Sequence, residues 1–253
     1  MKIDTILFDM GGTLEDVTYN RDVRLEGTRH ILNCLADKNI YIDEEPEAFL
    51  DILQKRNSEY KTWCEKSLIE SSPLEIWYKW HLKDFNIEEE KLADICEELA
   101  YIWETKFYKR SLREDVPSVL EELKRKGYKL GIISNTSSHT QVFRTLKGYG
   151  IDNYFECVYL SSIEGMRKPR VDIFYRAVEK LNSKPEKAAY VGDTISRDVI
   201  GSKNAGYAAA IQIASFLTGT ADSKVGEQTY KPDYVISNMA EILDILDTIN
   251  CDE

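Results

Sequence analysis

Cysteine is scarce in this sequence, and long apolar runs are missing. The five cysteines among 253 residues occur without CxxC spacing, and an odd number cannot pair completely into disulfides. We therefore expect reduced thiols and a cytoplasmic location. A membrane-spanning helix needs about 20 consecutive apolar residues, and no stretch approaches that length. Because a strand pattern begins at Ile3, we expect no signal peptide and no membrane partner.

Basic residues are also in deficit. Lys and Arg number 33 against 44 Asp and Glu, which gives a formal net charge of −11. We therefore expect no nucleic-acid partner, since such proteins carry a basic surface, and an anionic substrate must be attracted by a local group of cations. The length and the hydrophobic content of 43% suit one good core with a smaller satellite domain. The chain could be a monomer or a homodimer.

The first motif is an apolar run that leads into a carboxylate. Residues 3–8 are predicted to form a buried strand, and Asp9 follows, with Gly11, Gly12 and Thr13 close behind. Sheets of alternating strands and helices bind their ligands beyond the carboxyl ends of the strands. Asp9 is therefore a candidate site residue, although a turn aspartate is the simpler interpretation of this motif alone.

A second motif combines a strand end with a predicted helix start. The strand predicted at 129–133 leads into Ser134 and Asn135, and residues 136–138 are predicted to open a helix. Free N–H groups at a helix start, together with the Ser134 hydroxyl, are donors for phosphate oxygens. A plain helix cap explains this serine equally well.

A third motif places a lysine directly before a proline. Lys168 precedes Pro169 and an amphipathic pattern that predicts a helix over 171–181. Most lysines are solvated surface charges, so Lys168 becomes a candidate only because of the motifs around it. Together with them, it would bring positive charge to a bound phosphate.

A fourth apolar run, at 188–191, ends in two acids five positions apart, Asp193 and Asp198. Mg²⁺ prefers oxygen ligands, usually one or two carboxylates completed by water and substrate phosphate. Asp9 and Asp193 at neighbouring strand ends would supply these carboxylates. Asp198 would act directly or through a water.

In order and spacing, the four motifs resemble those of the haloacid dehalogenase-like hydrolase superfamily, from Ile3 to about Tyr207. The resemblance implies an α/β fold with a Rossmann-like parallel sheet core and helices on both faces. It also implies that Asp9 is the nucleophile and that Lys168 assists it. The implied phosphate-binding residues are Gly12, Thr13, Ser134, Asn135 and Lys168, and the implied magnesium ligands are Asp9, the backbone carbonyl of Gly11, Asp193 and Asp198.

The segment between the first two motifs is far longer than a crossover helix requires. Its apolar residues recur at helical spacing, which predicts helices over 23–37, 44–64, 73–82 and 88–108. We therefore predict an inserted all-α cap domain at 16–109 and a hydrolase core formed by 1–15 and 110–253. In the resemblance, such a cap closes over the site and selects the substrate. We expect His30 and His81 in this segment to be surface or packing residues rather than ligands.

The sequence departs from its relatives at Gly11. Most phosphatases of the superfamily have an aspartate there, which acts as general acid and then as base, a role that contributes about 10²- to 10⁴-fold to the rate. The backbone carbonyl at this position remains available to a metal. Glu15, Asp16 and His139 are candidates for a substitute acid.

Three functions are compatible with these motifs. The leading hypothesis is a Mg²⁺-dependent phosphatase that hydrolyses a small phosphorylated metabolite through an aspartyl-phosphate. A 2-haloacid dehalogenase would use Asp9 against carbon without a metal, but Asp193 beside it would then raise a carboxylate pKa and weaken the nucleophile. The third is a catalytically weak phosphate-binding or regulatory homologue, because of Gly11.

The missing acid generates a prediction about the leaving group. Aryl or acyl phosphates, whose leaving groups need little protonation, should be hydrolysed faster than alkyl phosphates. From the sequence alone, Gly11→Asp should then raise turnover of alkyl phosphates. Equal kcat/KM for alkyl and aryl esters in the wild type would point to a substitute acid.

Overall fold

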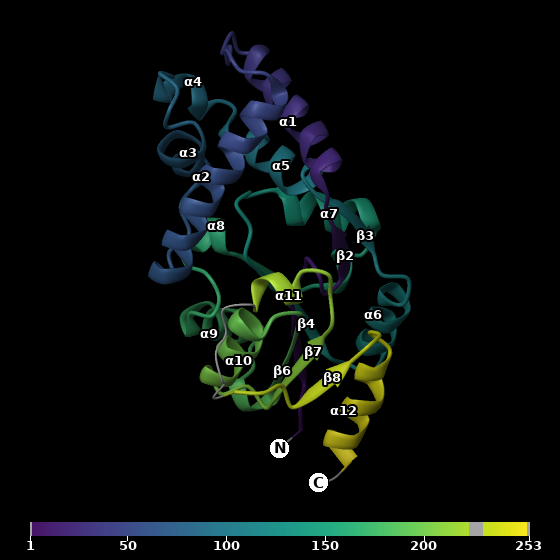
Figure 1. Ribbon diagram of the computed structural model, residues 1–253. Coiled ribbons are helices and arrows are strands. Elements are labelled where there is room, and N and C mark those ends of the chain that lie inside the picture. Colours follow the sequence, from purple (N-terminus) through teal and green to yellow (C-terminus); the bar gives the residue numbers. More distant parts are fainter. Residues whose placement is uncertain (1, 223–229, 252–253) are drawn as a thin grey trace.

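The computed structural model describes residues 2–222 and 230–251, and its centre is a six-stranded parallel sheet (Figure 1). The strand order is β5-β4-β1-β6-β7-β8. The bounds are β1 (Thr5–Phe8), β4 (Lys129–Ser134), β5 (Cys157–Leu160), β6 (Ala188–Gly192), β7 (Ala209–Ile213) and β8 (Tyr234–Ile236).

The position of β1 explains why Asp9 lies at the centre of the sheet edge. β1 pairs with β4 on one side and β6 on the other, and Phe8 is in register with Ile132 and Val191. All four residues of β1 are buried, as expected for a central strand covered on both faces. Residues that follow these paired positions at the ends of β4 and β6, including Ser134 and Asp193, are thereby brought beside Asp9.

Helices cover both faces of the sheet, and side chains along each strand alternate between these two faces. Ile6 and Phe8 point into one apolar cluster, whereas Leu7 points into the other. The first cluster is completed by α6 (Val116–Arg125), α7 (Gln141–Tyr149) and α12 (Glu241–Cys251), and the second by α9 (Val171–Lys180). The predicted fold class, a Rossmann-like α/β core, is confirmed.

Short helical turns join these layers. Their bounds are η2 (Asp152–Tyr154), α8 (Ser161–Glu164), η3 (Pro185–Lys187), η4 (Ile195–Val199), α10 (Ile200–Asn204) and α11 (Thr218–Ala221). Residues 223–229, which follow α11, lie outside the described residues.

Residues 21–106, here called the helical insertion, form a second layer with an apolar cluster of their own. A two-stranded antiparallel ribbon, β2 (Glu15–Thr18) with β3 (Lys109–Leu112), connects this layer to the sheet. The helices are α1 (Arg21–Ala36), α2 (Pro46–Ser67), α3 (Pro73–Glu75), η1 (Ile76–His81), α4 (Glu89–Ala93) and α5 (Cys96–Lys106). The domain boundaries at 16–109 stay a prediction.

Two helix predictions were wrong in their bounds. The helix predicted at 88–108 is broken between α4 and α5, because Ile95 takes a non-helical conformation with φ −125° and ψ −5°. The helix predicted to open at 136–138 begins only at Gln141, because backbone N–H groups from 136 to 140 bond to side chains instead.

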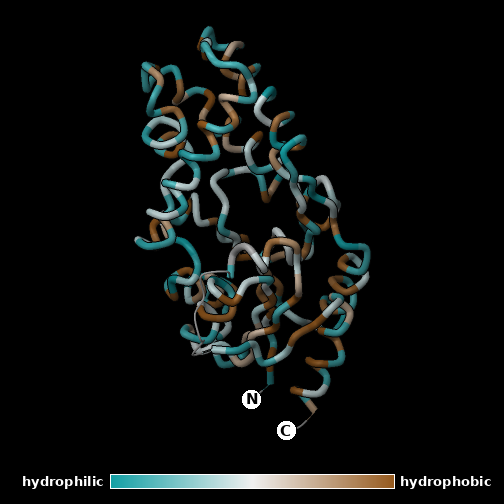
Figure 2. Tube along the Cα trace, in the orientation of Figure 1, coloured by the Kyte–Doolittle hydropathy of each residue, from teal (hydrophilic) through white to brown (hydrophobic). Residues whose placement is uncertain are grey.

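Apolar residues follow the sheet and recur along the helices of the insertion, with hydrophilic segments between them (Figure 2). Such a pattern is expected when each layer buries one of its faces. Among residues 2–222 and 230–251, no helix has both the length and the apolar character that a bilayer crossing requires.

His81 is a packing residue, in agreement with the sequence-based expectation. Its ring lies 4.7 Å, between centroids, from each of Trp77 and Trp103, and the side chain is almost fully buried. Neither ring nitrogen has a hydrogen-bond partner among the described residues. Burial, and secondarily the nearby Lys61 charge, lowers the pKa of His81 to about 3, so the imidazole stays neutral.

This buried imidazole predicts an acid-sensitive fold. An unfolded histidine takes up a proton near pH 6.5, whereas His81 in the folded protein does so only near pH 3. The free energy of unfolding should therefore fall as the pH drops through this window, by at most about 1.4 kcal/mol per pH unit from this residue. Urea unfolding of the wild type and His81→Phe at several pH values measures the contribution. Parallel pH profiles for the two proteins would contradict it.

Candidate active site

The Lys168 ammonium lies among buried acids at the carboxyl ends of β1 and β6. Its Nζ is 2.9 Å from Asp9 Oδ1 and 2.7 Å from Asp198 Oδ1, and it donates to the Tyr190 hydroxyl at 2.8 Å. Only 1% of the Lys168 side chain is exposed. A lysine so deeply buried requires charged partners, so Lys168 is a fixed charge of the site and not a surface residue.

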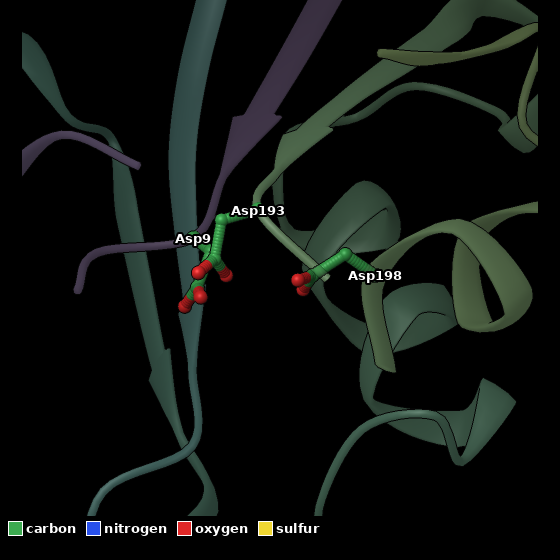
Figure 3. Close-up of side chains that lie close together, drawn as sticks. All are labelled: Asp9, Asp193 and Asp198. Atoms are coloured by element: carbon green, nitrogen blue, oxygen red, sulfur yellow. The ribbon is translucent and has the colours of Figure 1, made fainter. Parts of the chain in front are cut away.

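The three predicted metal-site carboxylates converge. Oxygens of Asp9, Asp193 and Asp198 lie within 4.8 Å of one another, and all three residues are buried. Figure 3 shows the carboxylates of Asp9 and Asp193 close together, with that of Asp198 facing them. Burial raises the pKa of Asp9 in spite of the opposing Lys168 charge. The fold thus sets three carboxylates against two cations, Lys168 and the Arg197 guanidinium, whose charge also attracts them.

Asp193 is the acid with an open ligand position. Its Oδ2 accepts from the Ser215 hydroxyl at 2.5 Å, but the buried Oδ1 has no partner among the described residues. Burial, followed by repulsion from Asp198, raises the pKa of Asp193 to about 7. An unpartnered carboxylate oxygen within reach of two other carboxylates suits a hard divalent cation such as Mg²⁺.

Gly12 makes room for this acid. A Cβ at position 12 would lie 2.4 Å from Asp193 Oδ2, and the backbone there has φ +85°, which glycine adopts without strain. Beside it, the buried hydroxyl of Thr13 has no partner among the described residues. Neither residue lines the cleft beside Asp9, and the phosphate contacts expected for them stay a prediction.

Asp198 is occupied by donors from the protein. One oxygen accepts from Lys168, and the other accepts from the Thr194 N–H at 3.0 Å and from the Thr194 hydroxyl at 2.5 Å. Although burial opposes it, attraction to Lys168 holds the pKa of Asp198 below its usual value. Asp198 is thus built to position Lys168, and contact with a metal through a water remains compatible with this geometry.

Asn135 brackets the backbone of Lys168. Its side-chain oxygen accepts from the Lys168 N–H at 2.9 Å, and its amide donates to the Lys168 carbonyl at 3.1 Å. Ser134, the last residue of β4, lines the same cleft as Asp9. Asn135 therefore fixes the lysine, a role that differs from the phosphate contact predicted for it.

The predicted N–H donors at 136–138 are not available to a phosphate. The Thr136 N–H donates to Ser161, the Ser137 N–H to Glu104 at 2.9 Å, and the Ser138 N–H to the Thr136 hydroxyl. The prediction was wrong because side chains, including one from the helical insertion, satisfy this loop.

Two glutamates of α5 attach the insertion to the core, and the sequence did not reveal them. Glu97 accepts from the Ser138 hydroxyl at 2.6 Å and from the N–H groups of 139 and 140, so it caps the start of α7. Glu104 accepts from both the N–H and the hydroxyl of Ser137. Their seven-residue spacing places them on one face of α5, which was the available signal.

Arg110 lies where the side chain of an acid at position 11 would begin. A Cβ on Gly11 would be 3.2 Å from Arg110 Nη1, which donates to the buried Glu15 at 2.9 Å. This arginine was also missed, since its position on β3 is remote in sequence from Gly11.

None of the three candidate substitute acids lines the cleft. Glu15 is fully buried and accepts from Arg110 and the Tyr149 hydroxyl. Asp16 is exposed and pairs with Arg113 at 3.2 Å. The His139 ring bonds the Ser162 carbonyl at 3.1 Å. Each has a structural partner that explains its position.

A cleft of about 410 Å³ separates the insertion from the sheet edge. Of the predicted site residues, Asp9, Gly11, Ser134, Asn135 and Lys168 line it. Three cations of the cleft wall, Arg24, Lys61 and Arg197, have no acidic partner within ion-pair distance among residues 2–222 and 230–251. In a chain of net charge −11, this is a local attraction for anions.

A model of the haloacid dehalogenase-like hydrolase family matches residues 3–206. Pyrophosphatase PpaX of Bacillus mycoides is 31% identical over 251 residues, which cover 99% of this chain and 100% of the relative.

Solved structures agree with this relationship. A HAD phosphatase from Thermococcus onnurineus has a TM-score of 0.58 at 26% identity and covers 97% of this chain and 98% of its own. A 2-haloacid dehalogenase from Pseudomonas syringae has a TM-score of 0.68 at 19% identity, with 98% and 99% covered, which shows a shared fold. From its motifs, its sheet and these matches, the chain belongs to the haloacid dehalogenase-like hydrolase family.

Proposed function

We propose that this protein is a Mg²⁺-dependent phosphatase that acts on a small phosphorylated metabolite through an aspartyl-phosphate at Asp9. The observation that carries the proposal is the buried arrangement of Lys168 between Asp9 and Asp198, beside the open oxygen of Asp193. A phosphate dianion can approach a carboxylate only where positive charge has been assembled beforehand, and this site is organised to assemble it.

In the first step, an Asp9 oxygen attacks phosphorus while the bond to the leaving oxygen breaks. Lys168 remains charged and complements the equatorial phosphoryl oxygens, together with the Ser134 hydroxyl. Asp198, Asn135 and the Tyr190 hydroxyl keep this ammonium in place. Precise positioning of charged groups supplies most of the rate enhancement in phosphoryl transfer.

The donor set fits Mg²⁺, which Asp9, the carbonyl of Gly11 and Asp193 would hold, with Asp198 acting through a water. When bound, the ion neutralises phosphate oxygens and aligns them with the nucleophile. It would also relieve the repulsion from Asp198, which adds to burial in raising the pKa of Asp193.

Dehalogenation is the less favoured alternative. The fold is shared with a 2-haloacid dehalogenase, but fold alone does not fix the reaction. A metal-free attack on carbon would not explain why Asp193 is buried close to Asp9 with one oxygen unpartnered among the described residues. The relatives named as a pyrophosphatase and a phosphatase also support phosphorus chemistry. The first of these names adds phosphoric anhydrides to the candidate substrates.

Replacement of the nucleophile tests this proposal. Asp9→Asn should reduce kcat on 4-nitrophenyl phosphate by on the order of 1,000-fold or more, because no covalent intermediate can form. Asp16→Asn is the matched control, since Asp16 is exposed on the adjoining ribbon, and it should stay within about twofold of the wild type. Full activity of Asp9→Asn would reject the proposed nucleophile.

The metal site predicts opposite effects on stability with and without Mg²⁺. Asp193→Asn removes an uncompensated buried charge, so the metal-free variant should unfold at the same or a higher temperature than the metal-free wild type. Saturating Mg²⁺ should stabilise only the wild type, by about 2.7 kcal/mol at 100 times Kd. Thermal unfolding with Mg²⁺ or a chelator measures both effects. An equal Mg²⁺ shift in the variant would contradict the ligand assignment.

A further inference from the structure

The space next to Gly11 contains a cation instead of an acid. Arg110 Nη1 would lie 3.2 Å from a Cβ at this position, and both residues line the cleft above Asp9. An aspartate there would give a proton to the leaving group. A guanidinium cannot do so, because it does not release its proton at physiological pH, but it can bind an oxygen that departs with negative charge.

Arg110 is rigidly fixed for such a role. It is on β3 opposite Val17, its Nη1 donates to Glu15, its Nη2 lies 3.2 Å from a Glu104 oxygen, and its Nε donates to the Glu104 carbonyl at 2.6 Å. These bonds use three of its five N–H groups. The remaining two are available to a ligand in the cleft.

Two more cations extend this surface into the helical insertion. Arg24 on α1 stacks on the Tyr19 ring, with its guanidinium carbon 3.9 Å from the ring centroid. Lys61 on α2 lines the same cleft. Neither pairs with an acid among the described residues, although the acids Glu65 and Glu104 also contribute to the wall. Unpaired cations beyond the reacting centre suit a substrate with a second anionic group.

We propose that Arg110 takes over from the absent acid by binding a leaving group that departs as an anion, so that the substrate is a phosphoric anhydride. One phosphoryl group would bind at Asp9 and Lys168, and Arg110, Arg24 and Lys61 would bind the second. This inference rests on the proposed phosphatase function and specifies its substrate class.

The reaction balances without a proton from the protein. Asp9 forms a bond to phosphorus, the anhydride P–O bond breaks, and its electron pair stays on the departing phosphate, which Arg110 binds. Water then attacks the phosphorus of the aspartyl-phosphate dianion, which regenerates the Asp9 carboxylate and releases H₂PO₄⁻ with both protons of that water. A phosphate leaving group is acidic enough to depart unprotonated, whereas an alkoxide is not.

This arrangement revises the expectation for Gly11→Asp. The new carboxylate would lie against Arg110, and an adjacent guanidinium lowers the pKa of an aspartate. It would therefore be a poor acid and would neutralise the leaving-group site. We now expect Gly11→Asp to reduce pyrophosphate hydrolysis and to raise alkyl phosphate hydrolysis by less than about threefold, well below the usual gain from a positioned acid.

The test compares substrates that differ in the charge of the leaving group. Pyrophosphate and 4-nitrophenyl phosphate both have acidic leaving groups, but only the former carries a second phosphoryl charge. Lys61→Met should lower kcat/KM for pyrophosphate by about tenfold, roughly the loss of one charge-assisted hydrogen bond, and that for 4-nitrophenyl phosphate by less than threefold. Arg110→Lys should lower kcat/KM for both substrates, because both leaving groups depart as anions. Lys55→Met, an exposed lysine on the same helix α2, is the matched control.

Binding provides a second readout that needs no turnover. Methylenediphosphonate should bind the wild type at least about tenfold more tightly than methylphosphonate does, and Lys61→Met should remove most of this difference. Because Lys61 is only partly buried, the variant should keep its thermal stability.

The outcomes separate this inference from the proposed function. If 4-nitrophenyl phosphate is hydrolysed through Asp9 but Lys61→Met affects both substrates equally, the anhydride assignment is wrong and the phosphatase stands. If the two phosphonates bind with equal affinity, the second anionic site is also rejected. If Asp9→Asn retains full activity, the proposed function fails whatever the substrate preference.

Discussion

One buried ammonium determines the arrangement of the site. Three carboxylates within 4.8 Å of one another would repel strongly in a medium of low polarity, and removal of each ion from water costs several kcal/mol. Lys168 compensates Asp9 and Asp198 directly, but Asp193 keeps an unpartnered oxygen and a raised pKa. This residual negative charge is the feature on which the proposed divalent-cation site rests.

The helical insertion meets the core through polar groups as well as apolar ones. Glu97 caps α7, Glu104 bonds the loop after β4, and Glu70 pairs with the buried Arg167 at 3.0 Å. Arg167 directly precedes Lys168, so contacts of the insertion extend to the chain segment that presents this lysine. Because broken buried ion pairs are costly, these contacts hold the insertion against the sheet edge and define the cleft between them.

The sequence predicted the parts of the site that follow from strand ends. Apolar runs before Asp9, Ser134 and Asp193 specified neighbouring parallel strands, and the register of β1 with β4 and β6 brings these residues together. Contacts between distant elements could not be predicted in this way. The proximity of Arg110 to Gly11 and the capping of the loop at 136–140 by α5 depend on how the insertion packs, which no local periodicity encodes. The helix start expected at 136–138 failed for that reason.

We propose that Asp9 becomes phosphorylated in a site where Gly11 replaces the usual acid–base aspartate. The aspartyl-phosphate should therefore accumulate, because water attack receives no help from an acid–base residue. The direct measurement is an acid quench during turnover of a substrate labelled on its transferred phosphoryl group, followed by digestion and peptide mapping. We predict the label on the peptide that contains Asp9, with loss of the label in Asp9→Asn. Turnover with no labelled peptide at any time, or with label on another residue, would contradict this account.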